Sequence, residues 1–176
     1  VSMAKTSGSF MPKPDMDCEI LRQIAVYDES TGDLLWKRTW GKRIKGEKVG
    51  TEIGQEGYMR LKFSGRNYQI HRLVWLYVHG QWPSGFVDHI DGNPRNNRIE
   101  NLREASQSEN LANSRKSKRN TSGFKGVSLA HNQKWRAYVS AKGKTHWLGY
   151  FKTKEEAFAA RIVAASRLHG EFARHS

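Results

Sequence analysis

The residues best suited to chemistry lie between Val87 and Asn110. Asp88 and His89 are adjacent at the end of a short apolar run, and an asparagine-rich loop follows them. One carboxylate and one amide oxygen are sufficient protein ligands for Mg²⁺, which keeps several of its water molecules. Imidazole is the usual general base near neutral pH. These residue types are those that metal-assisted hydrolysis of a phosphodiester bond requires.

Hydrolysis of a phosphodiester needs an activated water, stabilisation of additional negative charge, and a proton for the leaving oxygen; a hydrated divalent cation supplies the last two. We therefore expect Asp88 and Asn110 to bind one Mg²⁺ or Mn²⁺ ion and His89 to deprotonate water. Adjacent side chains of a regular strand point to opposite faces. Asp88 and His89 reach one phosphate only if the strand ends or bends there, which Gly92 and Pro94 allow. Asn110 is alternatively an ordinary solvent-facing helix residue.

The elements around this stretch follow from apolar periodicity and turn residues. Residues 86–90 and 102–105 are expected to form two short strands that flank a loop of residues 91–101. A helix is expected to begin at Ser106, because Ser106 and Glu109 form a capping box. The predicted unit is strand, loop, strand and helix, with the helix packed back against the strands.

Residues before this unit predict a small supporting body. A helix is expected over residues 17–25, then hairpins within residues 26–36 and 58–70. Residues 71–79 have apolar side chains at helical spacing, and Gly80 is expected to end that helix.

Several polar residues allow two interpretations. His71 either lines the site or packs its ring at the start of a helix. Asp91 and Asn93 either join the site or form an Asx turn, and the turn is the commoner role of such residues.

The charge of the chain points to a polyanionic partner. The 176 residues carry a formal net charge of +13, and the pI is near 10. Residues 1–110 hold 16 basic and 14 acidic side chains, whereas residues 111–176 hold 14 and 3. We therefore expect a nearly neutral body and a strongly basic module that grips nucleic acid.

The motif combination resembles the HNH nuclease family, in the branch found in phage homing endonucleases. It consists of Asp88-His89, Asp91-Gly92-Asn93, Asn96-Asn97, Asn101-Leu102-Arg103, Asn110, and the flanking His71–Trp75 and Gly80–Pro83. The resemblance covers residues 25 to 113 and implies a two-strand, one-helix metal fold. It also implies that Asn101 ties the loop and holds the general base without binding metal. Many relatives carry His where this chain has Asn110, so the metal preference stays open.

The basic half resembles the AP2/ERF DNA-binding domain over residues 121–172. The resemblance rests on Gly123-Phe124-Lys125-Gly126, Lys134-Trp135-Arg136, Trp147-Leu148-Gly149 and the capping box of Thr153 with Glu156. It implies a three-stranded sheet that enters the major groove and packs on one helix. Strand alternation places Trp135, Ala137 and Val139 toward the helix. The helix itself is expected to present Ala157, Ala160, Ala164 and Leu168 as its narrow buried face.

The candidate DNA contacts lie in the basic linker and on the outer face of the sheet. The alternative is an ordinary solvated basic face, which the strong charge imbalance disfavours. Linker contacts would mainly add salt-dependent affinity for phosphates. The candidates are Arg115, Lys116, Lys118, Arg119, Lys125, Lys134, Arg136, Tyr138, Ser140, Thr145 and Trp147.

Together these features predict an α+β protein with a ββα-metal nuclease domain and a small antiparallel sheet on one helix. The expected divisions are a disordered N-terminus at 1–14, a nuclease domain at 15–112 with its core at 86–112, a linker at 113–122, and an AP2-like domain at 123–172.

The expected function is metal-dependent cleavage of double-stranded DNA by a homing or nicking endonuclease, as a monomer or a transient homodimer. A lone Cys18 and the lack of long apolar runs predict a cytoplasmic protein of a bacterial host, without a membrane partner. One alternative is a non-catalytic AP2-type regulator with a decayed nuclease fold. A role on RNA is a third possibility.

Overall fold

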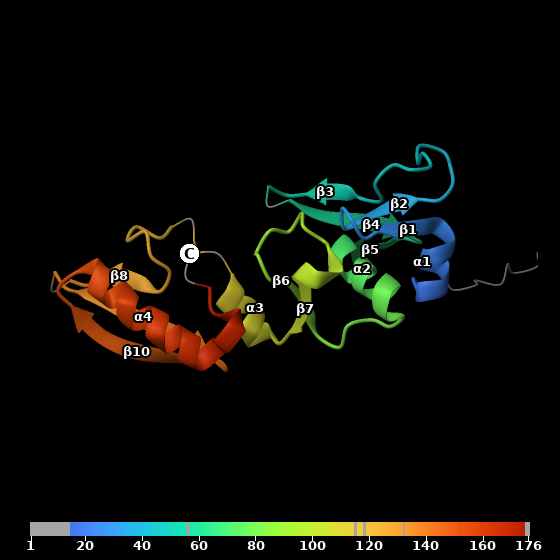
Figure 1. Cartoon of the computed structure of the whole chain (residues 1–176). Coiled ribbons are helices and arrows are strands. Elements are labelled where there is room, and N and C mark those ends of the chain that lie inside the picture. Colours follow the sequence, from blue (N-terminus) through green and yellow to red (C-terminus); the bar gives the residue numbers. More distant parts are fainter. Residues whose placement is uncertain (1–14, 56, 115, 118, 132, 175–176) are drawn as a thin grey trace, which may run out of the picture.

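The computed structural model describes residues 15–174, except 56, 115, 118 and 132. Figure 1 shows an elongated molecule with two halves, joined through the helix α3 near the middle. The predicted disordered segment 1–14 lies outside the described residues. Within the described residues, no helix combines the length and the apolar character that crossing a membrane requires.

The N-terminal half is a small α+β body with two separate antiparallel sheets. The sheet orders are β1-β2 and β3-β4-β5. Its elements are α1 (Cys18–Ile24), β1 (Ala25–Asp28), β2 (Asp33–Trp36), β3 (Thr51–Ile53), β4 (Tyr58–Phe63), β5 (Arg66–Gln69) and α2 (Ile70–His79). The two hairpins and the second helix were predicted from turn residues and periodicity. Gly80 ends α2 in the left-handed conformation, with φ of 74°.

The hydrophobic core of this half also anchors the strands that carry the candidate site. Helix α2 contributes Leu73, Val74 and Leu76, all buried, to a cluster that includes Leu21 and Leu34. Val87 and Leu102, from the two site strands, belong to the same cluster. The site strands are therefore fixed to a packed body although each is only four residues long.

The site unit follows the predicted order of strand, loop, strand and helix. Strand β6 (Phe86–His89) pairs antiparallel with β7 (Leu102–Ala105), and the loop between them ends in a short 3₁₀ turn η1 (Ile99–Asn101). Helix α3 (Gln107–Asn113) begins after Ser106, whose hydroxyl accepts from the Glu109 N–H, and both bonds of the capping box are present. Because α3 extends through Asn113, the linker begins one residue later than predicted.

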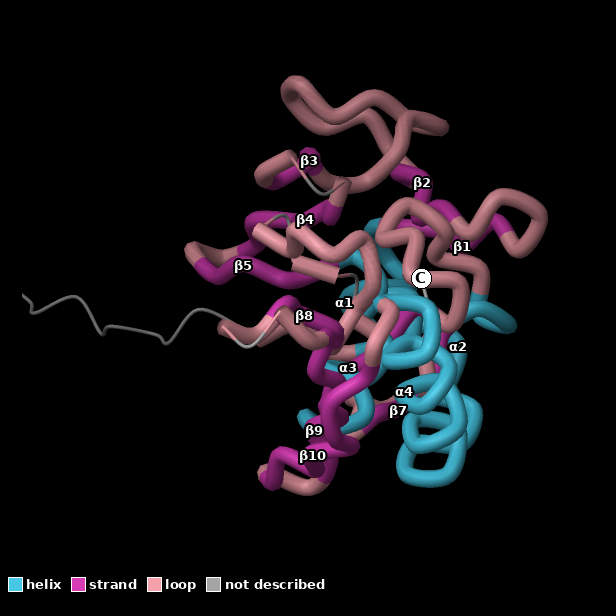
Figure 2. Tube along the Cα trace, turned by 90° about the vertical axis from the view of Figure 1, so that its left-hand side faces the viewer, coloured by secondary structure: helices cyan, strands magenta, loops and turns pink. Residues whose placement is uncertain are grey.

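The C-terminal half is a three-stranded antiparallel sheet covered by one helix. The strands are β8 (Val127–Leu129), β9 (Trp135–Ala141) and β10 (Lys144–Phe151), in the order β10-β9-β8. Helix α4 (Lys154–His169) lies along one face of the sheet, and the 3₁₀ turn η2 (Gly170–Phe172) follows it (Figure 2). Burial alternates along β9 as predicted, with Ala137 and Val139 inside.

The buried face of α4 differs from the prediction. The sequence suggested a stripe through Ala157, Ala160, Ala164 and Leu168. The helix buries Ala157 as predicted, but its other buried residues are Arg161 and Ala165. A residue four positions later lies one turn along the same side of a helix, so this stripe runs directly along the sheet. Leu168 is 37% exposed, whereas Arg161 is only 4% exposed.

Candidate active site

Strand register places an arginine opposite the acidic residue of the motif. Asp88 on β6 is the direct partner of Arg103 on β7. Arg103 donates from Nε and Nη2 to Asp88 Oδ2, at 3.2 and 3.1 Å. The side chains are only 13% and 8% exposed, so solvent screens this ion pair weakly. Arg103 thus already compensates the negative charge of Asp88, the predicted metal ligand.

An asparagine at the end of α3 completes the surroundings of Asp88. Asn113 donates from Nδ2 to Asp88 Oδ1 at 3.0 Å, to Oδ2 at 2.8 Å and to the His89 carbonyl at 2.7 Å. The side chain of Asn113 is buried. The helix therefore returns an asparagine to the β6 carboxylate, as the sequence suggested.

That asparagine is not the predicted one. Asn110 is half-buried one turn earlier, where its backbone N–H donates to the Ser106 carbonyl. The expectation placed the first turns of the helix at Asp88, whereas the structure places the last turn there. The reason is the direction in which α3 packs: its C-terminal end, and not its capped start, lies against β6.

His89 is held by a residue of the loop. Its Nε2 lies 3.0 Å from Asn97 Oδ1, and both side chains are buried. Because an amide oxygen only accepts, this bond requires the proton on Nε2 and leaves Nδ1 unprotonated in the neutral ring. Burial lowers the pKa of His89 below its ordinary value, against the bond to Asn97 and the nearby carboxylates, which raise it. A neutral imidazole is the form that can accept a proton.

Asn101 ties the two ends of the loop together. Its Oδ1 accepts from the Asp91 N–H at 3.0 Å, and its Nδ2 donates to Asp91 Oδ1 and to the Asn96 carbonyl. Its backbone carbonyl accepts from Ile90. The His89 ring is held by Asn97 and not by Asn101. The structure thus divides two roles, loop closure and support of the base, that the sequence analysis gave to Asn101 alone.

Asp91 forms an Asx turn. Its Oδ1 accepts from the Asn93 N–H at 2.7 Å, and its Oδ2 accepts from Asn96 Nδ2 at 2.8 Å. Partial burial favours a higher pKa for Asp91, but the hydrogen bonds from Asn93, Asn96 and Asn101 outweigh it and lower the pKa. The carboxylate of Asp91 therefore organises the loop, and Gly92 completes the turn with φ of 65°.

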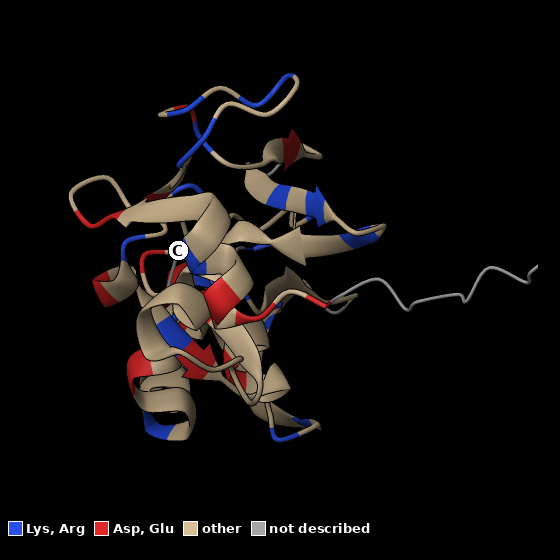
Figure 3. Cartoon of the chain, turned by 90° about the vertical axis from the view of Figure 1, so that its right-hand side faces the viewer, with Lys and Arg blue, Asp and Glu red and all other residues tan. Residues whose placement is uncertain are grey.

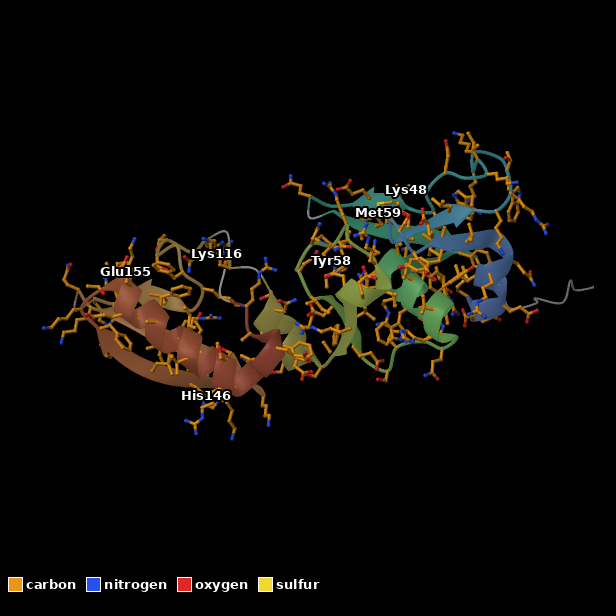
Figure 4. The ribbon with its side chains drawn as sticks, viewed as in Figure 1. Lys48, Tyr58, Met59, Lys116, His146 and Glu155 are labelled. Carbon is orange, nitrogen blue, oxygen red and sulfur yellow. The ribbon has the colours of Figure 1, made fainter. Side chains whose placement is uncertain are left out.

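His71 lies beside His89 in a cluster of aromatic rings. The ring centroids of His71 and His89 are 5.1 Å apart, and Tyr58 lies 5.8 and 6.1 Å from them. Figure 4 shows Tyr58 on the side of the N-terminal half that faces the C-terminal half. Burial, with the charges of His89 and Arg72, lowers the pKa of His71 to about 3. The open question about His71 is thus answered in part: it packs its ring, and it does so against the candidate base.

The chemistry around Asp88 suits a hard cation. Among the described residues, no group of three or more His, Cys, Asp or Glu side chains is arranged to hold a metal ion. An ion at Asp88 would rely on this carboxylate, amide oxygens and water, which is a ligand set that Mg²⁺ and Mn²⁺ accept. The guanidinium of Arg103 already places positive charge against Asp88. A divalent ion that coordinates Asp88 Oδ2 would therefore have to replace this guanidinium.

The C-terminal half holds the helix that carries Asn113. Lys125 donates from Nζ to the carbonyls of Ala112 and Ser114, both at 2.6 Å, and to that of Leu111 at 3.3 Å. A cation at this end satisfies carbonyls that lack helical partners and complements the helix dipole. Burial, with the charges of Arg161 and Arg174, lowers the pKa of Lys125 to about 8.

Comparisons with known proteins relate part of this chain to HNH endonucleases. A family model described as HNH endonuclease matches residues 68–112. Protein 3.8 of Escherichia phage T7 is 42% identical over 108 residues, which are 59% of this chain and 87% of the T7 protein. An uncharacterised HNH endonuclease of Acanthamoeba polyphaga mimivirus is 35% identical over 123 residues, which are 69% and 63% of the two chains.

Residues 68–112, which carry the site, match the HNH endonuclease family. A solved structure, titled as DNA binding and cleavage by the HNH homing endonuclease I-HmuI, is 28% identical with a TM-score of 0.40. The match covers 56% of this chain and 55% of that one. The HNH family model ends at residue 112, so Asn113 and the whole C-terminal half lie outside it.

Outward side chains of the C-terminal sheet form the largest set of predicted DNA contacts. Trp147 is 63% exposed, and its ring lies 5.5 Å from that of Tyr138. The guanidinium of Arg136 lies 5.6 Å from the Trp147 ring and donates to Ser128 Oγ. The remaining predicted residues of this face, Lys134, Ser140 and Thr145, are exposed.

Other predicted contacts are placed differently or are not described. Lys125, predicted to contact DNA, has its ammonium group on α3 instead. Lys116 is exposed and donates to the Gly123 carbonyl, and Arg119 is also exposed. Arg115 and Lys118 lie outside the described residues.

The N-terminal half also carries segregated positive charge. Its overall balance is near neutral, yet Lys and Arg gather along the loop between β2 and β3, which protrudes from the body (Figure 3). Trp40 in this loop is 68% exposed. Net charge alone therefore underestimated the basic surface of the N-terminal half.

Sequence reasoning missed three residues of the site. Asn97 and Arg103 belong to the motif that carries the HNH resemblance, but were given no role of their own. Asn113 was placed in the linker. The repeat of Asn at positions 110 and 113 was the available signal, since residues three apart share a helix face.

Proposed function

We propose that this chain is a metal-dependent endonuclease that hydrolyses phosphodiester bonds of duplex DNA at preferred sites. The observation that carries the proposal is the end of β6, where Asp88 and His89 are buried side by side beneath the last turn of α3. The match of residues 68–112 to the HNH endonuclease family supports a nuclease. Homing endonucleases among its relatives support DNA as the substrate.

Each polar residue of the site has a distinct role in this proposal. Asp88 and an asparagine of α3 bind a single Mg²⁺ or Mn²⁺ ion, which supplies charge stabilisation and an acidic water molecule when bound. His89 takes the proton of the attacking water at Nδ1, while Asn97 keeps its ring in that tautomer. Asn101 and Asp91 hold the loop closed, so that Asp88 and His89 keep their relative positions.

The identity of the asparagine ligand is open to a direct test. Asn110 is the ligand that the motif predicts, and Asn113 is the residue that bonds to Asp88 in the structure. Rotation of the Asn113 amide would present its oxygen in place of Nδ2. Mn²⁺ affinity of Asn110→Ala and Asn113→Ala, measured without DNA, identifies the ligand as the residue whose loss weakens binding more.

The C-terminal sheet is proposed to position the DNA. Its exposed Tyr138 and Trp147 and the adjacent Arg136 form a face on which a groove and its phosphates can lie. The AP2/ERF resemblance supports a major-groove contact by this sheet. Because such a sheet reads bases and the active site does not, the sheet sets where the enzyme cuts.

A plasmid-nicking assay tests the proposal. Wild-type protein with Mg²⁺ should convert supercoiled plasmid to the nicked form, and His89→Ala should lose this activity while still binding DNA. His79→Ala is the matched control, because His79 is exposed at the end of α2, where its ring packs on Trp75. If the wild type binds DNA but does not cleave it with any divalent cation, the chain acts as a non-catalytic DNA-binding regulator.

A further inference from the structure

Arg103 joins the candidate active site to the C-terminal half. Two of its nitrogens donate to Asp88 Oδ2, and its Nη1 donates to the Glu171 carbonyl at 3.2 Å. The ring centroid of Phe172 lies 3.6 Å from its Cζ. Glu171 and Phe172 belong to the turn η2, which packs beside α3 between the two halves (Figure 1). One side chain therefore contacts both the predicted metal-binding carboxylate and a turn 68 residues later in the chain.

The two ends of Arg103 are fixed by different parts of the fold. Strand register alone puts its backbone opposite Asp88. Register does not fix a long, flexible side chain, because an arginine must lose rotamer freedom to stay in one place. The carbonyl of Glu171 and the face of Phe172 supply the additional contacts that hold the guanidinium plane.

The arrangement leaves no room for a second cation on the same oxygen. Asp88 Oδ2 accepts from Arg103 Nε, Arg103 Nη2 and Asn113 Nδ2. A divalent ion that coordinates this oxygen must displace the guanidinium, both for space and because like charges repel at that distance. The pair is buried, so the repulsion would be only weakly screened.

We propose that η2 is a latch that keeps Arg103 on Asp88 and so opposes metal binding in the DNA-free protein. This inference rests on the proposed function, in which Asp88 binds a divalent ion. In the latch, Phe172 is a positioning residue that acts through Arg103 and touches no substrate. Release of the latch frees Asp88 for the ion and leaves Arg103 beside the site where the scissile phosphate binds.

The latch links the two halves of the protein. η2 follows directly from α4, which covers the sheet proposed to bind DNA. A second C-terminal residue, Arg174, packs on the site loop, where a Cβ added at Gly92 would collide with its guanidinium. A shift of α4 upon DNA binding would therefore move both contacts. By linkage, DNA that shifts η2 must raise the affinity for the ion, and the ion must raise the affinity for that DNA.

Mn²⁺ affinity of the full chain without DNA, measured by electron paramagnetic resonance, tests the latch. Phe172→Leu keeps an apolar contact but removes the aromatic face, and should tighten Mn²⁺ binding about fivefold, the scale of a lost cation–π contact. Phe172→Tyr retains the ring and should match wild type. Trp40→Leu is the control, because it removes a cation–π contact at Arg43 in the loop between β2 and β3, and it should leave Mn²⁺ affinity unchanged.

A double-mutant cycle separates the latch from a general loosening of the fold. Arg103→Gln removes the charge but keeps a donor for Asp88, and should tighten Mn²⁺ binding by at least about tenfold. In the Arg103→Gln background, Phe172→Leu should have no further effect on affinity. Circular dichroism and thermal unfolding of each variant confirm that it is folded.

The possible outcomes are distinct. Unchanged or weaker Mn²⁺ binding by Phe172→Leu overturns the latch, as does an equal gain from that substitution in the Arg103→Gln background. If neither wild type nor Arg103→Gln binds Mn²⁺, the proposed metal-dependent function fails together with the latch. If wild type cleaves DNA with Mg²⁺ and the Phe172 variants bind Mn²⁺ equally, only the latch fails.

Discussion

The two halves of the protein present their polar side chains in opposite ways. In the N-terminal half and at the end of α3, four polar residues of the candidate site are buried: Asp88, His89, Asn97 and Asn113. Each bonds to another member of the set or to nearby backbone. In the C-terminal half, the predicted contact residues stand on an open sheet face, where Trp147 and Tyr138 are exposed. The buried set fixes geometry, whereas the open face leaves its groups available to a large partner.

The difference predicts different responses to substitution. A buried hydrogen-bonded group is costly to disturb, because its partner loses a bond that water cannot replace. An exposed cation mainly contributes screened, additive attraction to phosphates. Changes at the buried site should therefore alter the rate of the proposed cleavage. Changes on the C-terminal sheet should alter DNA affinity and its salt dependence.

The largest effect is expected for Asp88→Asn. The substitution keeps the shape of the side chain but removes the negative charge, so Mg²⁺-dependent nicking should fall by at least about 10³-fold. DNA affinity measured in EDTA should not fall. Glu104→Gln is the matched control, since Glu104 is an exposed carboxylate of β7 that bonds to Ser84. An equal loss of nicking in Asp88→Asn and Glu104→Gln would contradict the special role of the buried carboxylate.

A smaller loss of activity is expected for Asn97→Ala. The His89 ring loses the acceptor for its Nε2 proton, so nicking should fall by roughly 10- to 100-fold with DNA affinity unchanged. Stability should fall by about 1–3 kcal/mol, because a buried donor is left without a partner. Asn96→Ala, which removes an exposed bond to Asp91, should reduce activity much less. Single-turnover cleavage rates and urea unfolding measure both effects.

The buried rings also predict an acid-sensitive fold. The folded pKa of His71 is about 3, below its ordinary value of 6.5, so the folded state binds fewer protons than the unfolded state. The neutral His71 ring contributes fully to the free energy of unfolding above pH 6.5. This contribution is lost as the pH falls toward 3, by up to about 1.4 kcal/mol per pH unit. Urea unfolding should show that the free energy of unfolding falls less between pH 7 and pH 5 for His71→Phe than for wild type.

The control for this prediction is His146→Gln. His146 is exposed on β10, and Figure 4 shows it at the outer edge of the C-terminal half, far from Tyr58. Its replacement should leave the pH dependence of unfolding unchanged. A wild-type fold as stable at pH 5 as at pH 7 would contradict the assignment of a neutral, buried His71.

The smallest effects on DNA binding are expected for single basic residues of the C-terminal half. Arg136→Met should lower the slope of log affinity against log salt by about one, the value of one phosphate contact. Lys125→Met should leave that slope unchanged but lower stability by about 1–3 kcal/mol, because Lys125 bonds to α3 carbonyls. Fluorescence anisotropy in a salt series distinguishes them. A reduced slope for Lys125→Met would restore its predicted role as a DNA contact.

The sequence by itself determined the order of elements and the chemistry of the site. Turn residues, capping boxes and apolar periodicity are local signals, so they located β6, β7, the start of α3 and the three strands of the C-terminal sheet. The motif around Asp88 and His89 identified a nuclease family for the same reason, since its residues are close in sequence.

Only the tertiary structure decided which side chains meet. Asn113 rather than Asn110 reaches Asp88, because the packing direction of α3 is set by contacts with both halves. Asn97 rather than Asn101 holds His89, because the loop folds back by bonds among its own side chains. Arg103 bonds to Asp88 through strand register and is then fixed by Phe172, from a turn at the far end of the chain. Packing joins residues distant in sequence, and no local pattern specifies those pairs.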